Sequence, residues 1–151
     1  MEHRISHDNM DDILKQLEDD YIHALNNNQC ENVEDFIEQF LYDSWDYNDR
    51  NIDMIKSVMS RYTQGKVYQT TFAGAFNEMV DHLQSMLSKL DKDNKYPMIH
   101  HNLGASILVA FVDGLVVQYY TGIYSVKDLR ENTPQFKKTI LSALCTDSLN
   151  E

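Results

Sequence analysis

The chain has 151 residues, of which 42% are hydrophobic, and its mean hydropathy is −0.50. These values suit a single domain with a real core and a well-solvated surface. Lys and Arg total 13 against 24 Asp and Glu, so the formal net charge is −11. A nucleic-acid-binding domain needs a basic face that displaces counterions from phosphates, so this composition excludes DNA or RNA binding by this domain alone and disfavours an anionic membrane surface.

Glycine and proline are scarce, with 5 and 2 residues. Many short strands would need more of them in turns, so the composition predicts an all-α fold of long helices. The longest apolar run, residues 103–117, is shorter than the ~20 residues that span a bilayer. The two cysteines, Cys30 and Cys145, form no CxxC pattern. With no apolar stretch typical of a secretory signal at the start, we expect a soluble, cytoplasmic protein with reduced thiols.

Helical periodicity begins near residue 9. Apolar residues recur at intervals of three and four up to residue 25 and predict a first amphipathic helix. A second helix is expected from Asn32, which is followed by acidic residues in the first turn. The polar segment 43–49 weakens the apolar pattern, so we expect a break or kink there. A third helix follows and is expected to end near Gly65.

A long fourth helix is expected over about residues 67–90, with a polar loop at 91–95 and a new helix start at Pro97. The next segment, Leu103–Val117, is apolar on nearly all sides. A helix that is apolar all round is buried all round. Because a small chain can cover only one side of it, we expect the other side to pack against a second subunit. The small residues of this segment allow close packing: Gly104, Ala105, Ala110 and Gly114.

Two start signals follow this apolar helix. Ser125 and Asp128 have the spacing of a capping box and predict a short helical turn. Thr133 followed by Pro134 predicts the start of the last helix, because proline is favoured at the first helical position.

The order of these elements resembles the C-terminal domain of the TetR/AcrR family of transcription regulators. The match lies in a long apolar helix that contains Asp113-Gly114, a connector from Ser125 to Leu129, and a last amphipathic helix. It is specific over about Leu103–Leu144 and extends over most of the chain as helix order. It implies an all-α helical bundle, a single domain over residues 1–151, that senses a small effector and dimerises through its last two long helices.

The family's N-terminal helix-turn-helix domain is absent from this chain. The resemblance therefore implies DNA binding, and repression as the usual outcome, for a parent protein only. Removal of that domain and its natural absence both stay open as explanations.

Aromatic and methionine side chains are the candidate ligand-binding residues. The resemblance implies an effector pocket for a small apolar or aromatic molecule among the middle helices, and bulky, flexible side chains suit such a cavity. For any one residue, ordinary core packing is the simpler explanation. A cationic effector is an alternative, since carboxylates near a pocket would neutralise it. The predicted ligand-binding residues are Phe40, Trp45, Met59, Tyr62, Phe72, Phe76 and Met79.

The predicted homodimer interface uses the last two long helices, about residues 103–120 and 133–144, paired with their two-fold mates in a four-helix bundle. A buried charge must be paired or hydrogen-bonded, so we expect Asp113 to form a structural hydrogen bond there. The predicted interface residues are Ile107, Val109, Phe111, Val112, Val116, Tyr120, Phe136, Ile140 and Leu144.

Catalytic and metal-binding patterns are weak. The sequence contains no G-x-S-x-G and no glycine-rich phosphate loop. Asp20-x-x-His23 and Glu78-x-x-x-His82 place potential ligands on single helix faces, but a strict Glu-x-x-His is missing. We therefore expect no enzymatic activity, cofactor or metal. Two alternatives stay open: a metal-binding or catalytic helical bundle, and a regulator paralogue without a DNA-binding domain that acts by heterodimerisation.

Overall fold

The computed structural model describes residues 7–63 and 69–146, and the side chains of residues 12–58, 60 and 77–146. Within these limits the regular structure is entirely α-helical, which confirms the all-α prediction. The helices are α1 (His7–Asn27), α2 (Val33–Arg50), α3 (Ile52–Thr63), α4 (Gln69–Leu90), α5 (Pro97–His100), α6 (Gly104–Tyr120) and α7 (Val126–Leu144).

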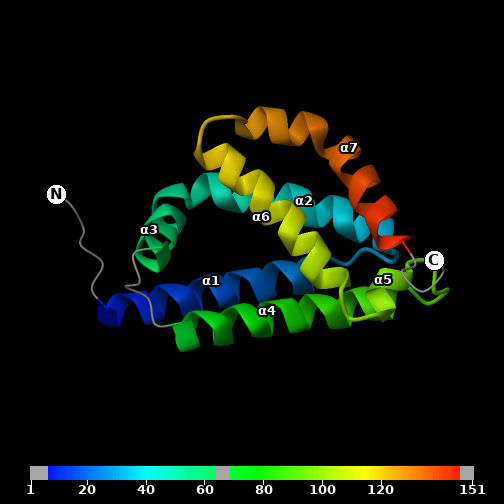
Figure 1. The fold of residues 1–151 in the computed structure, drawn as a ribbon, viewed down its shortest axis with the longest axis horizontal. Helices are drawn as coiled ribbons and strands as arrows, with labels where there is room; N and C mark the ends of the chain where they lie inside the picture. Colours follow the sequence, from blue (N-terminus) through cyan, green and yellow to red (C-terminus); the bar gives the residue numbers. More distant parts are fainter. Residues whose placement is uncertain (1–6, 64–68, 147–151) are drawn as a thin grey trace.

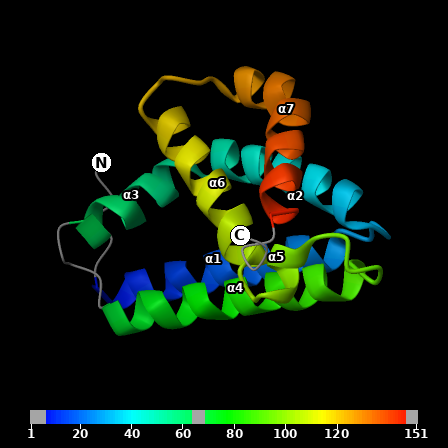
Figure 2. The same ribbon diagram turned by 45° about the vertical axis from the view of Figure 1, so that its right-hand side comes forward.

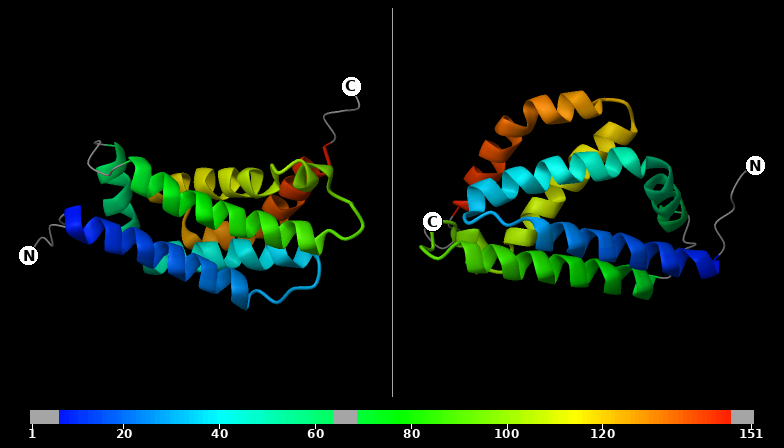
Figure 3. Two further views of the ribbon diagram at one scale, coloured as in Figure 1. Left: turned by 90° about the horizontal axis from the view of Figure 1, so that it is seen from below. Right: turned by 180° about the vertical axis from the view of Figure 1, so that it is seen from behind.

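Two pairs of helices form the two sides of the molecule. Helices α1 and α4 lie side by side, and α2 packs against α7 (Figures 1 and 3). Helix α6 crosses between these pairs and contacts α4, α7 and α2 (Figures 1 and 2). In the view of Figure 1, α6 passes in front of α2, and no described helix covers its front. Among the described helices, none combines the length and the apolar character needed to cross a bilayer.

The core lies between α2 and the helices on both sides of it. Helix α2 contributes an apolar stripe at intervals of three and four residues, which places all its large apolar side chains on one face. Burying each such side chain stabilises the fold by about 1.5–3 kcal/mol. The largest fully buried side chains are Trp45, Phe36, Leu25, Ile37, Leu41, Leu83, Leu87, Ile99, Leu108, Leu129, Ile140 and Leu144.

The break that the polar segment 43–49 predicts is absent, because α2 continues through it to Arg50. Trp45 is buried and extends the apolar stripe of the helix. Polar neighbours bond back to the helix itself: the Ser44 hydroxyl donates to the Phe40 carbonyl at 2.7 Å, and the Asn48 amide donates to the Ser44 carbonyl at 2.8 Å. Side chains that satisfy their hydrogen bonds within the helix do not interrupt it.

The last helix begins earlier than Thr133-Pro134 predicts. The Ser125–Asp128 capping box is present, but it starts a continuous helix that runs to Leu144, with Pro134 inside it. Proline removes one backbone donor and kinks a helix, and α7 bends along its length in Figures 1 and 2.

Thr133 serves packing instead of capping. Its buried hydroxyl donates to the Leu129 carbonyl at 2.7 Å and accepts the Trp45 indole N–H at 2.9 Å. This contact joins α2 to α7 across 88 residues of sequence.

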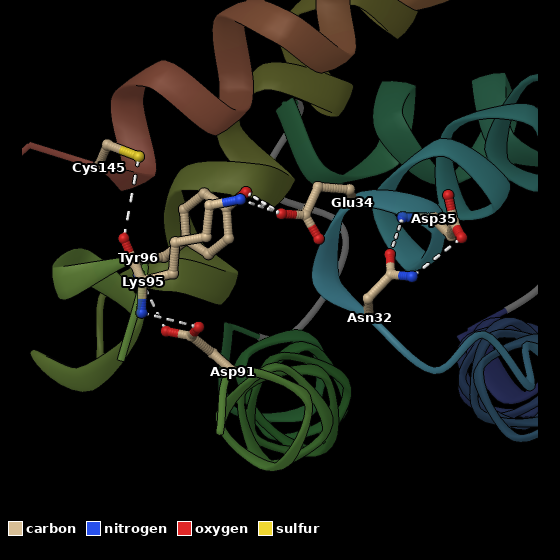
Figure 4. A network of polar contacts seen from close by, with 7 residues as sticks. All are labelled: Asn32, Glu34, Asp35, Asp91, Lys95, Tyr96 and Cys145. Atoms are coloured by element: carbon tan, nitrogen blue, oxygen red, sulfur yellow. Dashed lines mark hydrogen bonds and ion pairs between the residues drawn. The ribbon is translucent and has the colours of Figure 1, made fainter. Parts of the chain in front are cut away.

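A polar network fixes the loop between α4 and α5 (Figure 4). The buried Asp91 carboxylate accepts the backbone N–H groups of Lys95 and Tyr96, each at 3.0 Å. The Tyr96 hydroxyl donates to the Glu34 carboxylate at 2.5 Å, and the Lys95 ammonium lies 2.9 Å from the same carboxylate oxygen. The network therefore ties this loop to the first turn of α2, next to the Asn32 cap.

Candidate functional site

A cavity of the described structure lies between α1, α2, α4 and α6, and Ile55 of α3 also lines it. Its volume is about 920 Å³, within the range of pockets that take small organic molecules. Because four helices supply its walls, a bound molecule would contact most of the bundle at once.

Apolar and aromatic side chains make up much of the wall. The Tyr21 and Phe40 rings meet edge to face, with centroids 5.9 Å apart and an interplanar angle of 82°. Helix α4 adds Met79 and Val80, and α6 adds Val109 and Val112. Such a wall suits the apolar or aromatic part of a ligand.

Carboxylates form part of the polar wall, together with uncharged side chains such as Gln39, Ser44 and Asn48. Asp20 accepts hydrogen bonds from the Tyr47 hydroxyl at 2.9 Å and the Gln16 amide at 2.7 Å. Asp43 accepts the Gln39 amide at 2.8 Å, and burial raises the pKa of its carboxyl group above the ordinary value. The described lining also includes these charged residues: Asp46, Asp113 and Arg50. Acidic groups therefore outnumber basic ones around the cavity.

Asp113 differs from the other lining carboxylates. Solvent reaches this residue, but no side-chain hydrogen bond or ion pair involves it within the described part of the chain. The protein atoms around the carboxylate reduce its solvation and raise its pKa to about 6. The structural hydrogen bond expected for Asp113 is thus not present among the described residues, and the side chain lines the cavity instead.

Tyr21 carries a second unpaired polar group. Its hydroxyl oxygen is buried and forms no hydrogen bond with a described residue. Burial, and secondarily the negative charge of Asp113, raise the pKa of this hydroxyl above its ordinary value. The hydroxyl therefore stays protonated at neutral pH, and the Asp113 charge contributes to the rise in its pKa.

Comparison of the chain with protein-family models, curated proteins and solved structures gave no match. The resemblance to TetR/AcrR regulators therefore depends on helix order and on the Leu103–Leu144 pattern alone.

The predicted ligand-binding residues separate into three groups. Phe40 and Met79 line the cavity. Trp45 does not: it is fully buried between α2 and α7, where its ring meets Phe136 edge to face at 6.4 Å and its N–H bonds Thr133. The remaining predicted side chains lie outside the part that the structure describes: Met59, Tyr62, Phe72 and Phe76.

Tyr21 and Asp113 are among the lining residues that the predicted ligand-binding set does not contain. Tyr21 belongs to the apolar stripe of α1 and was indistinguishable from core residues of the same stripe. Asp113 is the single charge in an apolar helix, and such an isolated charge could have indicated a functional site from the sequence. Without the fold, the sequence does not show that both residues reach the same cavity.

The predicted interface residues mostly face the protein's own core. Ile140 and Leu144 are fully buried, and Val112 and Val116 nearly so. The other predicted residues are half-buried and pack against the same core: Ile107, Val109, Phe111, Tyr120 and Phe136. Ile140 and Leu144 could reach a second subunit only if the subunit core opened, whereas the half-buried side chains are partly accessible, so the interface through these residues stays a prediction.

A different face of α6 is exposed. Its residues recur at intervals of three and four and are mostly small or apolar, with one carboxylate: Leu103, Ser106, Ala110, Asp113, Gly114 and Val117. A Cβ atom added at Gly114 would meet nothing within 4 Å, whereas one at Gly104 would lie 2.9 Å from Ile99. Close packing at Gly104 is therefore internal to the subunit, and the exposed α6 face is open.

Three of the described histidines each bond to a single neighbour. His23 pairs with the Asn27 amide at 2.9 Å, His82 with Asn26 at 3.2 Å, and His100 with Asp91 at 2.8 Å. Within the described residues, no three His, Cys, Asp or Glu side chains are grouped so that they would hold a metal ion.

Proposed function

We propose that this chain is the effector-sensing and dimerising domain of a TetR-like transcription regulator, with repression as the outcome that the resemblance implies. The observation that carries the proposal is the cavity of about 920 Å³ among the middle helices. Its volume and its aromatic and aliphatic wall suit a small, partly apolar molecule.

The position of α6 supports a sensing role. On one side of this helix Val109 and Val112 line the cavity, on the other side lies the exposed α6 face, and the exposed Asp113 lies at the edge between them. A ligand that shifts α6 therefore also shifts the surface available to a second subunit. In a parent protein with DNA-binding domains, such a shift would change their spacing and lower operator affinity.

The two alternatives differ in how far they depart from the proposed function. A metal-binding or catalytic bundle needs converging ligands or a nucleophile with a base, and the described residues group no metal ligands. A paralogue that acts by heterodimerisation would keep the same cavity and the same exposed face, so it is a variant of the proposed function.

Fluorescence titration with the neutral dye N-phenyl-1-naphthylamine tests the proposal. The dye brightens in an apolar site, and we expect saturable binding at one site per chain. Ala24 lines the cavity, so Ala24→Phe would fill part of it and weaken binding by about tenfold or more, a change of about 1.4 kcal/mol.

The matched control is Lys15→Phe, which adds the same ring to an exposed position of α1 outside the cavity. It should leave the affinity unchanged. Equal loss in both variants, or no saturable binding to the wild-type chain, would contradict a ligand-binding role for the cavity.

A further inference from the structure

Two polar groups that line the same cavity have no hydrogen-bond partner among the described residues. The Tyr21 hydroxyl on α1 is buried, whereas the Asp113 carboxylate on α6 is exposed to solvent. A buried hydroxyl without a partner carries a free-energy cost. A ligand that bonds this hydroxyl and also pairs with the carboxylate would satisfy both groups.

The surroundings of these groups define the chemistry of that ligand. The Tyr21 and Phe40 rings and the Val109 and Val112 side chains form the adjacent wall. Aromatic faces attract organic cations, and aliphatic groups accept the apolar substituents of such cations. The charge of Asp113 is negative, so an anion would be repelled, and a cation would gain an attraction that a neutral ligand lacks.

A bare metal ion does not fit this arrangement. Hard cations need six or more oxygen ligands, and no described group of His, Cys, Asp and Glu side chains converges in that way. An organic cation needs only one carboxylate and an aromatic contact.

We propose that the cavity binds an organic cation, an alkylated or protonated amine with an aromatic or aliphatic substituent, whose ammonium group lies between Tyr21 and Asp113. The proposal rests on the proposed function, because a cavity that binds no small molecule would bind no cation. The substituent would occupy the apolar wall formed by α2, α4 and α6, and the remaining carboxylates would add a favourable field.

Three probes of matched shape test the charge requirement. They are the cation trimethyl(2-naphthylmethyl)ammonium, the neutral 2-naphthylmethanol and the anion 2-naphthylacetate, each titrated calorimetrically and by displacement of N-phenyl-1-naphthylamine. We expect the cation to bind about fivefold tighter than the neutral probe, since attraction to an exposed carboxylate contributes up to about 1 kcal/mol. The anion should bind more weakly than either.

Asp113→Asn should remove most of the advantage of the cation while leaving the affinity for the neutral probe unchanged. The matched control is Asp19→Asn, which removes the same charge from an exposed position of α1 outside the cavity. It should lower the affinity for the cation by less than about twofold, the effect of net charge alone.

Tyr21→Phe provides an independent readout, because it deletes only the unpaired hydroxyl. We expect the melting temperature to stay the same or rise, since no hydrogen bond is lost. The affinity for a protonated analogue, 2-naphthylmethylamine, should fall severalfold, because its N–H groups lose an acceptor.

The outcomes separate the two proposals. Equal affinities for cation and neutral probe, or equal effects of the two Asp→Asn changes, would overturn the cation site and leave the sensing function intact. Absence of binding by all the probes would overturn both. A large fall in melting temperature in Tyr21→Phe would show that the hydroxyl is already paired and would remove the basis for the inference.

Discussion

At the scale of single residues, the difference between Trp45 and Asp113 shows what a sequence pattern can and cannot determine. Both residues stand out in the sequence: Trp45 is the only tryptophan, and Asp113 is the single charge in an apolar helix. Size and aromaticity suggested a ligand contact for Trp45, yet these properties also suit a core, and the core is where it lies. For Asp113 the sequence suggested a buried charge with a structural hydrogen bond, yet the residue is exposed, has no described partner and lines the cavity.

The Trp45–Thr133 hydrogen bond leads to a residue-scale prediction. Thr133→Val keeps the shape of the buried side chain but removes the acceptor for the indole N–H, so the free energy of unfolding should fall by about 1–3 kcal/mol. Chemical denaturation in urea measures this change.

The matched control is Thr139→Val on the same helix. Thr139 also bonds its own helix, to the Gln135 carbonyl at 3.0 Å, but it is exposed and holds no partner on another helix. Its substitution should change the free energy of unfolding by less than about 0.5 kcal/mol. A similar loss in the two variants would mean that the inter-helix bond contributes nothing beyond a local effect.

At the scale of helices, periodicity predicted which segments are helical but not where each one ends. The stripes of α1, α2 and α4 follow from apolar spacing, and the Ser125–Asp128 box marks the start of α7. The errors arose where two local signals competed. The polar run 43–49 signalled a loop, but the burial of Trp45 and the side-chain bonds of the helix outweighed it.

A similar competition between two local signals explains where α7 begins. Thr133-Pro134 signalled a helix start, but the buried hydrogen bonds of Thr133 hold this residue within a longer helix. The face that each helix buries was harder still to predict. Helix α6 is apolar nearly all round, so periodicity could not separate its core face from its exposed face.

The contact between α2 and the α4–α5 loop predicts a pH-dependent stability. Hydrogen bonds from Tyr96 and then Lys95 lower the pKa of Glu34 to about 2 from an ordinary value of 4.5. A lowered carboxyl pKa stabilises the fold at pH values above 4.5, and this contribution is lost as the pH falls from 4.5 through 2. Glu34→Gln should therefore lower the melting temperature at pH 7, and the difference from wild type should narrow below pH 4.5.

Differential scanning calorimetry between pH 7 and pH 3 would measure both effects. Glu31→Gln makes the same chemical change at an exposed position just before α2, and it should give a smaller difference at pH 7. A difference between wild type and Glu34→Gln that grows on acidification would have the wrong sign and would contradict the role assigned to this carboxylate.

At the scale of the whole molecule, the chain combines a strongly acidic composition with an exposed α6 face that is mostly small or apolar. The net charge of −11 keeps copies of the chain apart unless a specific surface brings them together. The exposed α6 face is the candidate, because Leu103 and Val117 are about half exposed there, at 47% and 48%, with small residues between them. Small residues let a partner helix approach closely along this line.

We therefore expect a homodimer through the exposed α6 face, in place of the core-facing residues that the sequence suggested. Sedimentation at about 100 µM, where a dimer with a micromolar Kd is well populated, should give twice the 17.6 kDa chain mass.

Ala110→Glu places a charge at the centre of this face and should yield a monomer with an unchanged helical spectrum. Ser85→Glu, at an exposed position on α4, adds the same charge away from it and should remain dimeric. A wild-type monomer at this concentration, or a dimer that survives Ala110→Glu, would show that α6 does not form the interface. A ligand in the cavity could then not affect a second subunit through α6.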